Sequence, residues 1–463
     1  MRQNKEVVVF TLVVTFILFC YSFFAAFLHT DVLHLKNVSI LADIFYDKDR
    51  PSPAKPVIPD TVMSATDRIA DEPLPGMDTG KKIFSKYLEP KILTNFSADN
   101  TKPALPRIMA RLHALKAGKK GKIRVAWFGD SLVEADILSM QFRKQMQQYF
   151  GAFGVGFIPA TSITSKFRIT ATHNWKGDWV EENFKSKDNT APLFFSGHTF
   201  FTGNGEVTIQ DNTVRDTPAV QLLEKSLICG PSKTGTISLV VDGKQKQYRA
   251  DKLVNRILLD NRNSRAITVG ISDSKVPVYG ISMEPESGVI VDNFSFRGIS
   301  GVELGKFDSS FLSTLTAEDN YDLIVLEYGA NILFRPNDID YSWYGVSMNH
   351  VLRKIKKAMP NTEILVISTA DRAFMYDGQW RTARGLYNLV KVQAEIAYNS
   401  GGAFYNMFLN MGGEGTICKW AMSNPPLAKE DRIHPNYKAS IVMGDMFFQS
   451  FMDEYNKAEV KKK

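Results

Sequence analysis

The 463-residue sequence predicts an α/β fold in which a parallel sheet flanked by helices carries an inserted β-sandwich and follows an N-terminal transmembrane helix. Strand-like and helix-like segments alternate before residue 157 and after residue 288, which is typical of a parallel sheet with helices on both faces. Between them, short β-prone segments are separated by turn residues, as in a sandwich of two sheets. A long uncharged run near the N-terminus predicts the membrane span.

These patterns divide the chain into five parts. Residues 1–30 form a cytoplasmic tip and membrane anchor, 31–80 a proline-bearing linker, 81–157 the first part of the sheet domain, 158–287 the inserted β-sandwich, and 288–463 the second part of the sheet domain. The sheet domain and the insert are each long enough to bury a core of their own.

The anchor is predicted from 22 consecutive uncharged residues, positions 7–28. As a helix this run measures about 33 Å, enough to cross a bilayer. Arg2 and Lys5 precede it, which favours a cytoplasmic N-terminus and export of the rest of the chain. The alternative is a long cleaved signal peptide, although the apolar region of such a peptide usually has only about 7–15 residues. Both interpretations place the body of the chain outside the cytoplasm.

Apolar spacing predicts the individual elements. A short helix carries Ile108, Leu112 and Leu115, and a buried strand begins at Ile123. Later strands are expected at 323–328 and 364–367, and later helices at 346–358, at 382–398 and around Met443, Phe447 and Phe451. In the insert, strands are expected at 199–202, 206–209, 236–241, 266–271 and 276–281.

The strand that begins at Ile123 stops at Gly-Asp-Ser, with Ser131 as the serine. The apolar stripe Leu138, Phe142, Met146 and Phe150 predicts a helix that follows at once. A serine at such a turn lies at the carboxyl end of a strand and near the positive end of a helix dipole, which suits a nucleophile. The alternative is that Asp130 and Ser131 only cap the helix.

A base for this serine is predicted in the segment from Asp431 to Asn436. His434 could take the serine proton, and Asp431, three residues before it, could fix the tautomer of the imidazole. The alternative is a solvated or helix-capping histidine.

Two further segments contain candidate hydrogen-bond donors for an oxyanion. Asn331 follows the strand at 323–328, and its carboxamide could donate to a developing negative charge. Gly298 could bring a bare backbone N–H close to a ligand. The alternative for both positions is ordinary turn formation.

Taken in order, the segments around Ser131, Gly298, Asn331 and His434 resemble the four sequence blocks of the SGNH/GDSL hydrolase family. The resemblance implies that Ser131 attacks an ester carbonyl, that His434 acts as general base and then general acid, and that Asp431 orients His434. It also implies an oxyanion hole formed by the N–H groups of Ser131 and Gly298 and the amide of Asn331.

Two positions qualify this resemblance. Ile332 stands where many family members carry an aspartate, and that aspartate is not a catalytic group, so bracing of the loop rather than activity is in question. Gly301 lies close to Gly298 and could take its place as the glycine of the second block.

A β-sandwich inserted at this point looks like the architecture of bacterial cell-wall O-acetylesterases, including peptidoglycan O-acetylesterases, whose insert resembles a carbohydrate-binding module. Trp175 and Trp179 in the insert, and Asp130 beside the nucleophile, are the candidate substrate-binding residues. The alternative is that the aromatic residues of the insert form its core, among them Phe194, Phe195, Phe200 and Phe201.

Composition adds weaker constraints. The formal charge of +7 is compatible with anionic envelope polymers or lipid headgroups, but it is weaker than a nucleic-acid-binding protein usually shows. No Cys/His cluster has metal-ligand spacing, and the family resemblance implies neither a metal nor another cofactor. Cys229 and Cys418 fall in different predicted domains, so a disulfide between them is possible but not favoured.

The sequence therefore predicts a membrane-anchored serine esterase that removes O-acetyl groups from a peptidoglycan-like envelope or extracellular glycan. Its catalytic domain is expected in the periplasm or extracellular space. One alternative is an O-acetyltransferase that uses the same residues to acylate a cell-envelope polysaccharide. The other is an inactive glycan-binding scaffold, against which the intact Ser131, Asn331, Asp431 and His434 argue.

Overall fold

The computed structural model describes residues 84–97, 99, 101–213, 222–318 and 320–459, all of which belong to one compact unit. The predicted membrane anchor and linker lie outside the described residues. Among the helices of the described ranges, none is long and apolar enough to cross a membrane.

A six-stranded sheet forms the centre of the sheet domain, in the order β1-β19-β16-β15-β2-β14. The strands are β1 (Leu93–Thr94), β2 (Lys122–Gly129), β14 (Gly288–Ser295), β15 (Leu323–Glu327), β16 (Glu363–Ile367) and β19 (Ala403–Tyr405). All neighbouring pairs are parallel except β1 with β19. Their near-continuous apolar runs fit strands that are covered on both faces, so the predicted α/β fold is confirmed.

Helices cover both faces of this sheet. The bounds are α3 (Pro106–Lys116), α4 (Ser139–Phe150), α5 (Ser309–Glu318), α6 (Ser342–Ala358), α7 (Leu386–Asn399), α8 (Met407–Asn410), α9 (Thr416–Met422) and α10 (Tyr437–Glu459). Alternate residues of β2 point to opposite faces: Trp127 joins the core under α3, α4 and α10, whereas Phe128 joins the core under α5, α6 and α7.

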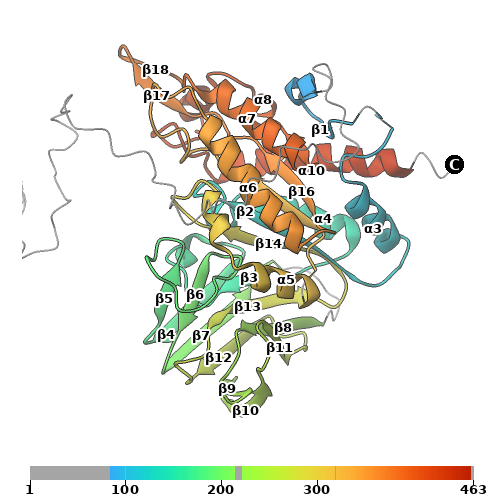
Figure 1. Cartoon of the computed structure of the whole chain (residues 1–463), viewed down its shortest axis with the longest axis vertical. Helices are drawn as coiled ribbons and strands as arrows, with labels where there is room; N and C mark the ends of the chain where they lie inside the picture. The colour runs from blue at the N-terminus through green and yellow to red at the C-terminus, as the bar shows by residue number, and fades with distance from the viewer. Residues whose placement is uncertain (1–83, 98, 100, 214–221, 319, 460–463) are drawn as a thin grey trace, which may run out of the picture. The chain divides into compact units, whose positions relative to one another are not determined.

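Between β2 and β14 the chain builds two antiparallel sheets, one in the order β10-β9-β12-β7-β4 and the other in the order β11-β8-β13-β6-β5, with β3 paired to β13. Their bounds are β3 (Gly156–Pro159), β4 (Ala171–Gly177), β5 (Val180–Asn183), β6 (His198–Phe201), β7 (Gly205–Asp211), β8 (Leu223–Cys229), β9 (Thr236–Val241), β10 (Lys244–Arg249), β11 (Asn255–Asp260), β12 (Ala266–Ile271) and β13 (Val278–Pro285). Both sheets contribute to one buried cluster, so they form a sandwich. Figure 1 shows its strands gathered below the main sheet.

The aromatic residues of the insert divide between core and surface. Phe200 is buried in the core of the sandwich, which confirms the core alternative for this residue. Phe194 and Phe195 are also fully buried, but they pack into the core of the sheet domain under α5, α6 and α7. Trp175 on β4 is exposed. Cys229 and Cys418 are both buried free thiols.

The prediction that a helix follows Gly-Asp-Ser at once is wrong. α4 begins only at Ser139, and the turn η3 (Glu134–Asp136) intervenes. Ala135 and Asp136 have φ angles of 63° and 69°, in the left-handed region that interrupts a helix. Ser131 therefore does not lie at the N-terminus of α4, and the helix-dipole argument for it does not hold.

The bounds of two predicted elements also differ from those in the structure. The helix expected at 382–398 begins at Leu386, because residues 379–382 form β18 (Gln379–Thr382), which pairs with β17 (Ala373–Tyr376). The strand expected at 276–281 is β13, which extends to Pro285. The predicted boundary between residues 157 and 158 falls inside β3.

Candidate active site

Ser131, His434 and Asp431 form a continuous hydrogen-bonded chain. The Oγ of Ser131 lies 3.3 Å from Nε2 of His434, and Nδ1 of His434 lies 2.8 Å from Oδ2 of Asp431. Ser131 comes two residues after the end of β2, and the other two lie on the loop that precedes α10. The serine–histidine distance is slightly long, as is common for catalytic hydrogen bonds before substrate binds.

The loop that carries His434 is held by local hydrogen bonds. Oδ1 of Asp431 accepts the N–H groups of Ile433 at 2.8 Å and His434 at 3.1 Å. Partial burial alone would raise the pKa of Asp431, but the hydrogen bonds from the His434 side chain and these two N–H groups hold it below its ordinary value. The Asp431 side chain therefore stays ionised and can fix Nδ1 of His434 as the protonated nitrogen.

The turn that carries Ser131 is organised by Asp130. Oδ1 of Asp130 accepts the N–H of Leu132 at 2.9 Å, and its main-chain oxygen accepts the N–H groups of Val133 and Glu134. Within the described part of the chain, the N–H of Ser131 donates no hydrogen bond. That N–H is therefore available to an oxyanion.

Asp130 is fully buried, so it does not face the substrate as predicted. Its role is structural, in the turn that carries Ser131. Burial raises its pKa to about 6, against the hydrogen bonds from Leu132, Gly329 and Asn331 and the attraction of His434. It acts on the site by holding neighbouring groups in place.

Asn331 follows β15 and points its carboxamide toward the same turn. Its Nδ2 donates to Oδ2 of Asp130 at 3.1 Å and to the carbonyl of Ile299 at 3.0 Å. Ile332 is buried in the core beneath the loop, and its N–H donates to the carbonyl of Gly329. Apolar packing therefore braces this loop.

The two candidate glycines differ in what their N–H groups do. Gly298 and Gly301 have φ angles of 74° and 96°, a region that favours glycine. The N–H of Gly301 donates to Oε2 of Glu303, and a Cβ at Gly301 would lie 2.7 Å from the ring of Tyr328. Among the described residues the N–H of Gly298 has no partner, so Gly298 remains the candidate donor.

Neither predicted tryptophan contacts the Ser131–His434–Asp431 chain in the described part of the structure. Trp175 is exposed on β4 beside His173. Trp179 packs against the core of the sandwich and donates from Nε1 to the carbonyl of Lys176. A role for either in binding polymer stays a prediction.

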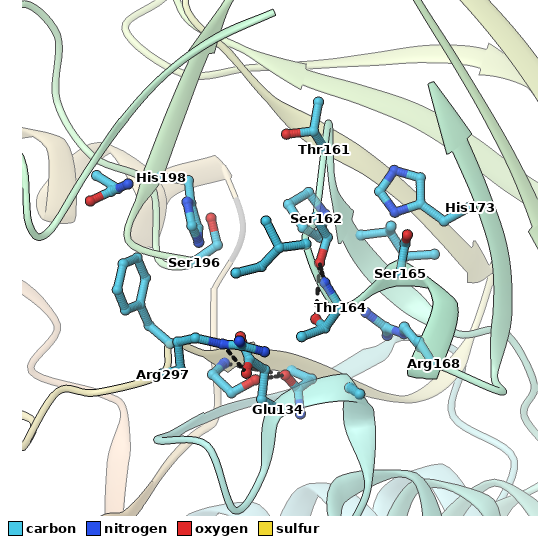
Figure 2. Close-up of a pocket in the computed structure, with 18 of the residues that line it drawn as sticks. Glu134, Thr161, Ser162, Thr164, Ser165, Arg168, His173, Ser196, His198 and Arg297 are labelled. Carbon is cyan, nitrogen blue, oxygen red and sulfur yellow. Dashed lines mark hydrogen bonds and ion pairs between the residues drawn. The ribbon is translucent and has the colours of Figure 1, made fainter. Parts of the chain in front are cut away.

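Two features of the site are not predicted by the sequence. Arg372, which is buried before β17, donates to the carbonyl of Ala330 at 2.7 Å and so holds the residue next to Asn331. A polar cavity of about 220 Å³ lies beside Arg297, between the sheet domain and the insert (Figure 2). Within the described ranges, no group of three or more His, Cys, Asp or Glu side chains is arranged to hold a metal.

Comparison with solved structures identifies the fold. The chain is similar to a peptidoglycan O-acetylesterase, with 21% identity, a TM-score of 0.62, and coverage of 75% of this chain and 95% of that one. Weaker similarities include a family two carbohydrate esterase from Cellvibrio japonicus (11% identity, 60% and 99% coverage, TM-score 0.25). A putative GDSL-like lipase from Parabacteroides merdae is also similar (14% identity, 36% and 74% coverage, TM-score 0.26).

No protein-family model and no curated protein sequence matches the chain significantly. The first similarity shows that this chain has the fold of that peptidoglycan O-acetylesterase, so the resemblance seen in the sequence is confirmed at the level of the fold.

Proposed function

We propose that this protein is a serine esterase that removes O-acetyl groups from an envelope or extracellular glycan of the peptidoglycan type. The observation that carries the proposal is the hydrogen-bonded chain from Ser131 through His434 to Asp431. The backbone N–H groups of Ser131 and Gly298, which have no partner among the described residues, add to it. The shared fold with a peptidoglycan O-acetylesterase supports the choice of an acetylated glycan as substrate.

In the first half-reaction, Oγ of Ser131 attacks the acetyl carbonyl while Nε2 of His434 takes its proton. The negative charge that forms on the carbonyl oxygen is stabilised by the N–H groups of Ser131 and Gly298. One N–H of Asn331, which donates to Asp130 and Ile299 before the reaction, exchanges its partner for the oxyanion. His434, as an imidazolium held by Asp431, then gives its proton to the departing sugar oxygen. The products are a free sugar hydroxyl and acetyl-Ser131.

In the second half-reaction, His434 takes a proton from water, which attacks the acetyl-enzyme. The second tetrahedral intermediate collapses, Ser131 recovers its proton from His434, and acetate leaves. An acetyltransferase would differ only in that a sugar hydroxyl replaces this water.

We further propose that the enzyme is anchored by one N-terminal helix and acts in the periplasm or extracellular space. This proposal is supported by the uncharged run at positions 7–28 and by the two basic residues before it.

The test is acetate release by the full-length protein in detergent from O-acetylated peptidoglycan and from O-acetylated xylan. We expect release that disappears in Ser131→Ala, which leaves at most the rate provided by binding and the oxyanion hole. Ser313→Ala, which alters an exposed serine on α5, is the matched control and should keep full activity.

Two outcomes would contradict the esterase. Slow hydrolysis with efficient Ser131-dependent transfer of acetyl groups to added sugars would identify a transferase. No Ser131-dependent turnover of any acetyl ester, with binding of the glycan intact, would identify a scaffold.

A further inference from the structure

The polar cavity borders the candidate active site. The sheet domain contributes Glu134, three residues after Ser131, and Arg297, directly before Gly298. The insert contributes the opposite wall, which includes Ser196 and His198 (Figure 2). Lys185 lies next to both the cavity and the candidate active site. It lines the cavity, and its Nζ lies only 3.1 Å from the position that a Cβ on Gly298 would occupy. A substrate with its ester at Ser131 would therefore pass the mouth of this cavity.

The ionisable groups that line the cavity carry an excess of positive charge. Three cations, Arg168, Lys185 and Arg297, face two carboxylates, Glu134 and Glu181, which leaves one net positive charge. Most of these groups are already paired. Arg297 binds Glu134 at 2.7 Å, Glu181 binds His198 at 2.9 Å, and Arg168 lies 3.4 Å from Asp136 behind the wall.

Lys185 differs from the other cations. Its ammonium lies 5.5 Å from the centre of the Phe296 ring, and within the described residues it forms no ion pair with a carboxylate. A lysine over an aromatic ring at the edge of a cavity keeps its charge available to a ligand.

A buried hydroxyl adds an independent indication of a ligand. Ser196 is 4% exposed and lines the cavity, yet its Oγ has no hydrogen-bond partner in the described structure. Leaving a buried hydroxyl without a partner is costly, and rotation of the covered Oγ toward a ligand in the cavity would remove this cost. A hydroxyl and an ammonium that line the same cavity are a donor set suited to an anion.

We propose that this cavity is a subsite for a carboxylate carried by the glycan whose acetyl ester is cleaved at Ser131. Lys185 supplies the charge, and the hydroxyl of Ser196, turned toward the cavity, donates a hydrogen bond to a carboxylate oxygen. One net positive charge matches a single carboxylate better than a phosphate monoester, which carries close to two charges at neutral pH. The subsite depends on the proposed esterase function, since it selects among acetylated glycans.

The catalytic test compares kcat/KM for three acetyl esters. These are O-acetylated polygalacturonate, which carries carboxylates, acetylated glucomannan, which is neutral, and 4-nitrophenyl acetate, which is small and neutral. Lys185→Gln and Ser196→Ala should each lower kcat/KM for the polygalacturonate about tenfold, mainly through KM. Both substitutions should leave kcat/KM for the two neutral esters unchanged within about twofold. Lys187 is an exposed lysine outside the cavity, and Lys187→Gln should leave kcat/KM unchanged for all three esters.

A binding test keeps this proposal separate from the esterase proposal. Ser131→Ala protein should bind trigalacturonate more tightly than cellotriose, and the added Lys185→Gln change should remove the difference. That result would support the subsite even if no ester were hydrolysed.

Three results would overturn the subsite. One is equal binding of the two trisaccharides. Another is an equal loss by Lys185→Gln on all three esters, which would mean that Lys185 acts on the geometry around Gly298. The third is tighter binding of glucose 6-phosphate than of galacturonate, which would assign the cavity to phosphate.

Discussion

The carboxylate of Asp130 accepts a hydrogen bond from the carboxamide of Asn331, with 3.1 Å between Oδ2 and Nδ2. The two residues follow β2 and β15, which are parallel neighbours in the sheet. The same nitrogen of Asn331 also donates to Ile299, which follows β14 on the other side of β2. The carboxamide of Asn331, which follows β15, therefore hydrogen-bonds to the segments that follow β2 and β14. These bonds fix the ends of three adjacent strands relative to one another.

Asn331→Ala should lower kcat by roughly 10²–10³ on any acetyl ester, because the variant lacks the N–H that turns from Asp130 or Ile299 to the oxyanion in the transition state. KM should change little, since the interaction strengthens only as negative charge develops. Steady-state kinetics with 4-nitrophenyl acetate would measure both constants. Asn399→Ala, an exposed asparagine at the end of α7, is the control. A loss below about threefold for Asn331→Ala would remove this amide from the oxyanion hole.

Asp431→Asn should lower kcat by roughly 10²–10⁴ without unfolding the protein, because an amide carries no charge to stabilise the imidazolium and its NH2 group can hold His434 in the wrong tautomer. The hydrogen bonds of Asp431 lower its pKa, so we expect no loss of wild-type activity from its protonation above about pH 5. Glu430→Gln alters the neighbouring exposed carboxylate and should be neutral. If Asp431→Asn kept full activity, the partner of His434 would have to be another group.

The arrangement of the candidate catalytic residues could be predicted because its signals are local. Ser131 and Asn331 each follow a buried apolar strand, and parallel strands bring their carboxyl ends to one edge of a sheet. Asp431 and His434 are close in sequence, so a single loop determines their contact. These properties are visible without knowing how distant segments meet.

The segment after Ser131 and the cavity could not be predicted in this way. The turn at Asp136 depends on Thr170, which lies 34 residues away. The cavity depends on the pairing of Glu134 with Arg297 across 163 residues. Single charged residues at such separations carry no spacing signal, so only the folded structure shows that they meet.

Glu327→Gln should stabilise the protein at alkaline pH. Glu327 is buried at the end of β15 and accepts Nε1–H of Trp127 at 2.9 Å, a bond that a glutamine oxygen can also accept. Burial, helped by the nearby Asp130, raises the pKa of Glu327 to about 8 against the effect of that bond. The folded state therefore holds a proton that the unfolded state releases near its ordinary pKa of about 4.3.

The direction of this effect follows from linkage. The contribution of Glu327 is fully present below about pH 4.3 and is lost as the pH rises through about 8. We expect urea unfolding at pH 5, 6.5 and 8 to show that the free energy of unfolding of Glu327→Gln increases relative to that of the wild type as the pH rises. The total change should be on the order of a few kcal/mol. A difference between Glu327→Gln and wild type that does not vary with pH would mean that Glu327 is ionised in the folded protein.

Asp136→Asn should destabilise the fold and disturb the turn after Ser131. The buried carboxylate of Asp136 binds Nη1 of Arg143 at 2.5 Å, the hydroxyl of Ser139 at 2.6 Å and that of Thr170 at 2.7 Å, and lies 3.4 Å from Arg168. Burial alone would raise its pKa, but the two arginines and these hydrogen bonds lower it to about 2. Asparagine tolerates the left-handed backbone at this position, so the substitution isolates the loss of charge.

Removing that charge leaves the buried guanidinium of Arg143 unpaired, which costs about 3–5 kcal/mol in the free energy of unfolding. Urea denaturation at pH 7 would measure the loss. Asp445→Asn, whose carboxylate accepts from the neutral Gln141 and Gln145, should lose far less stability. Because the pKa of Asp136 is depressed in the folded state, its contribution is present above about pH 4 and is lost as the pH falls toward 2. The wild type and Asp136→Asn should therefore converge in stability under acid. A gap that stayed constant from pH 7 to pH 3 would show that the asparagine acts through packing rather than through charge.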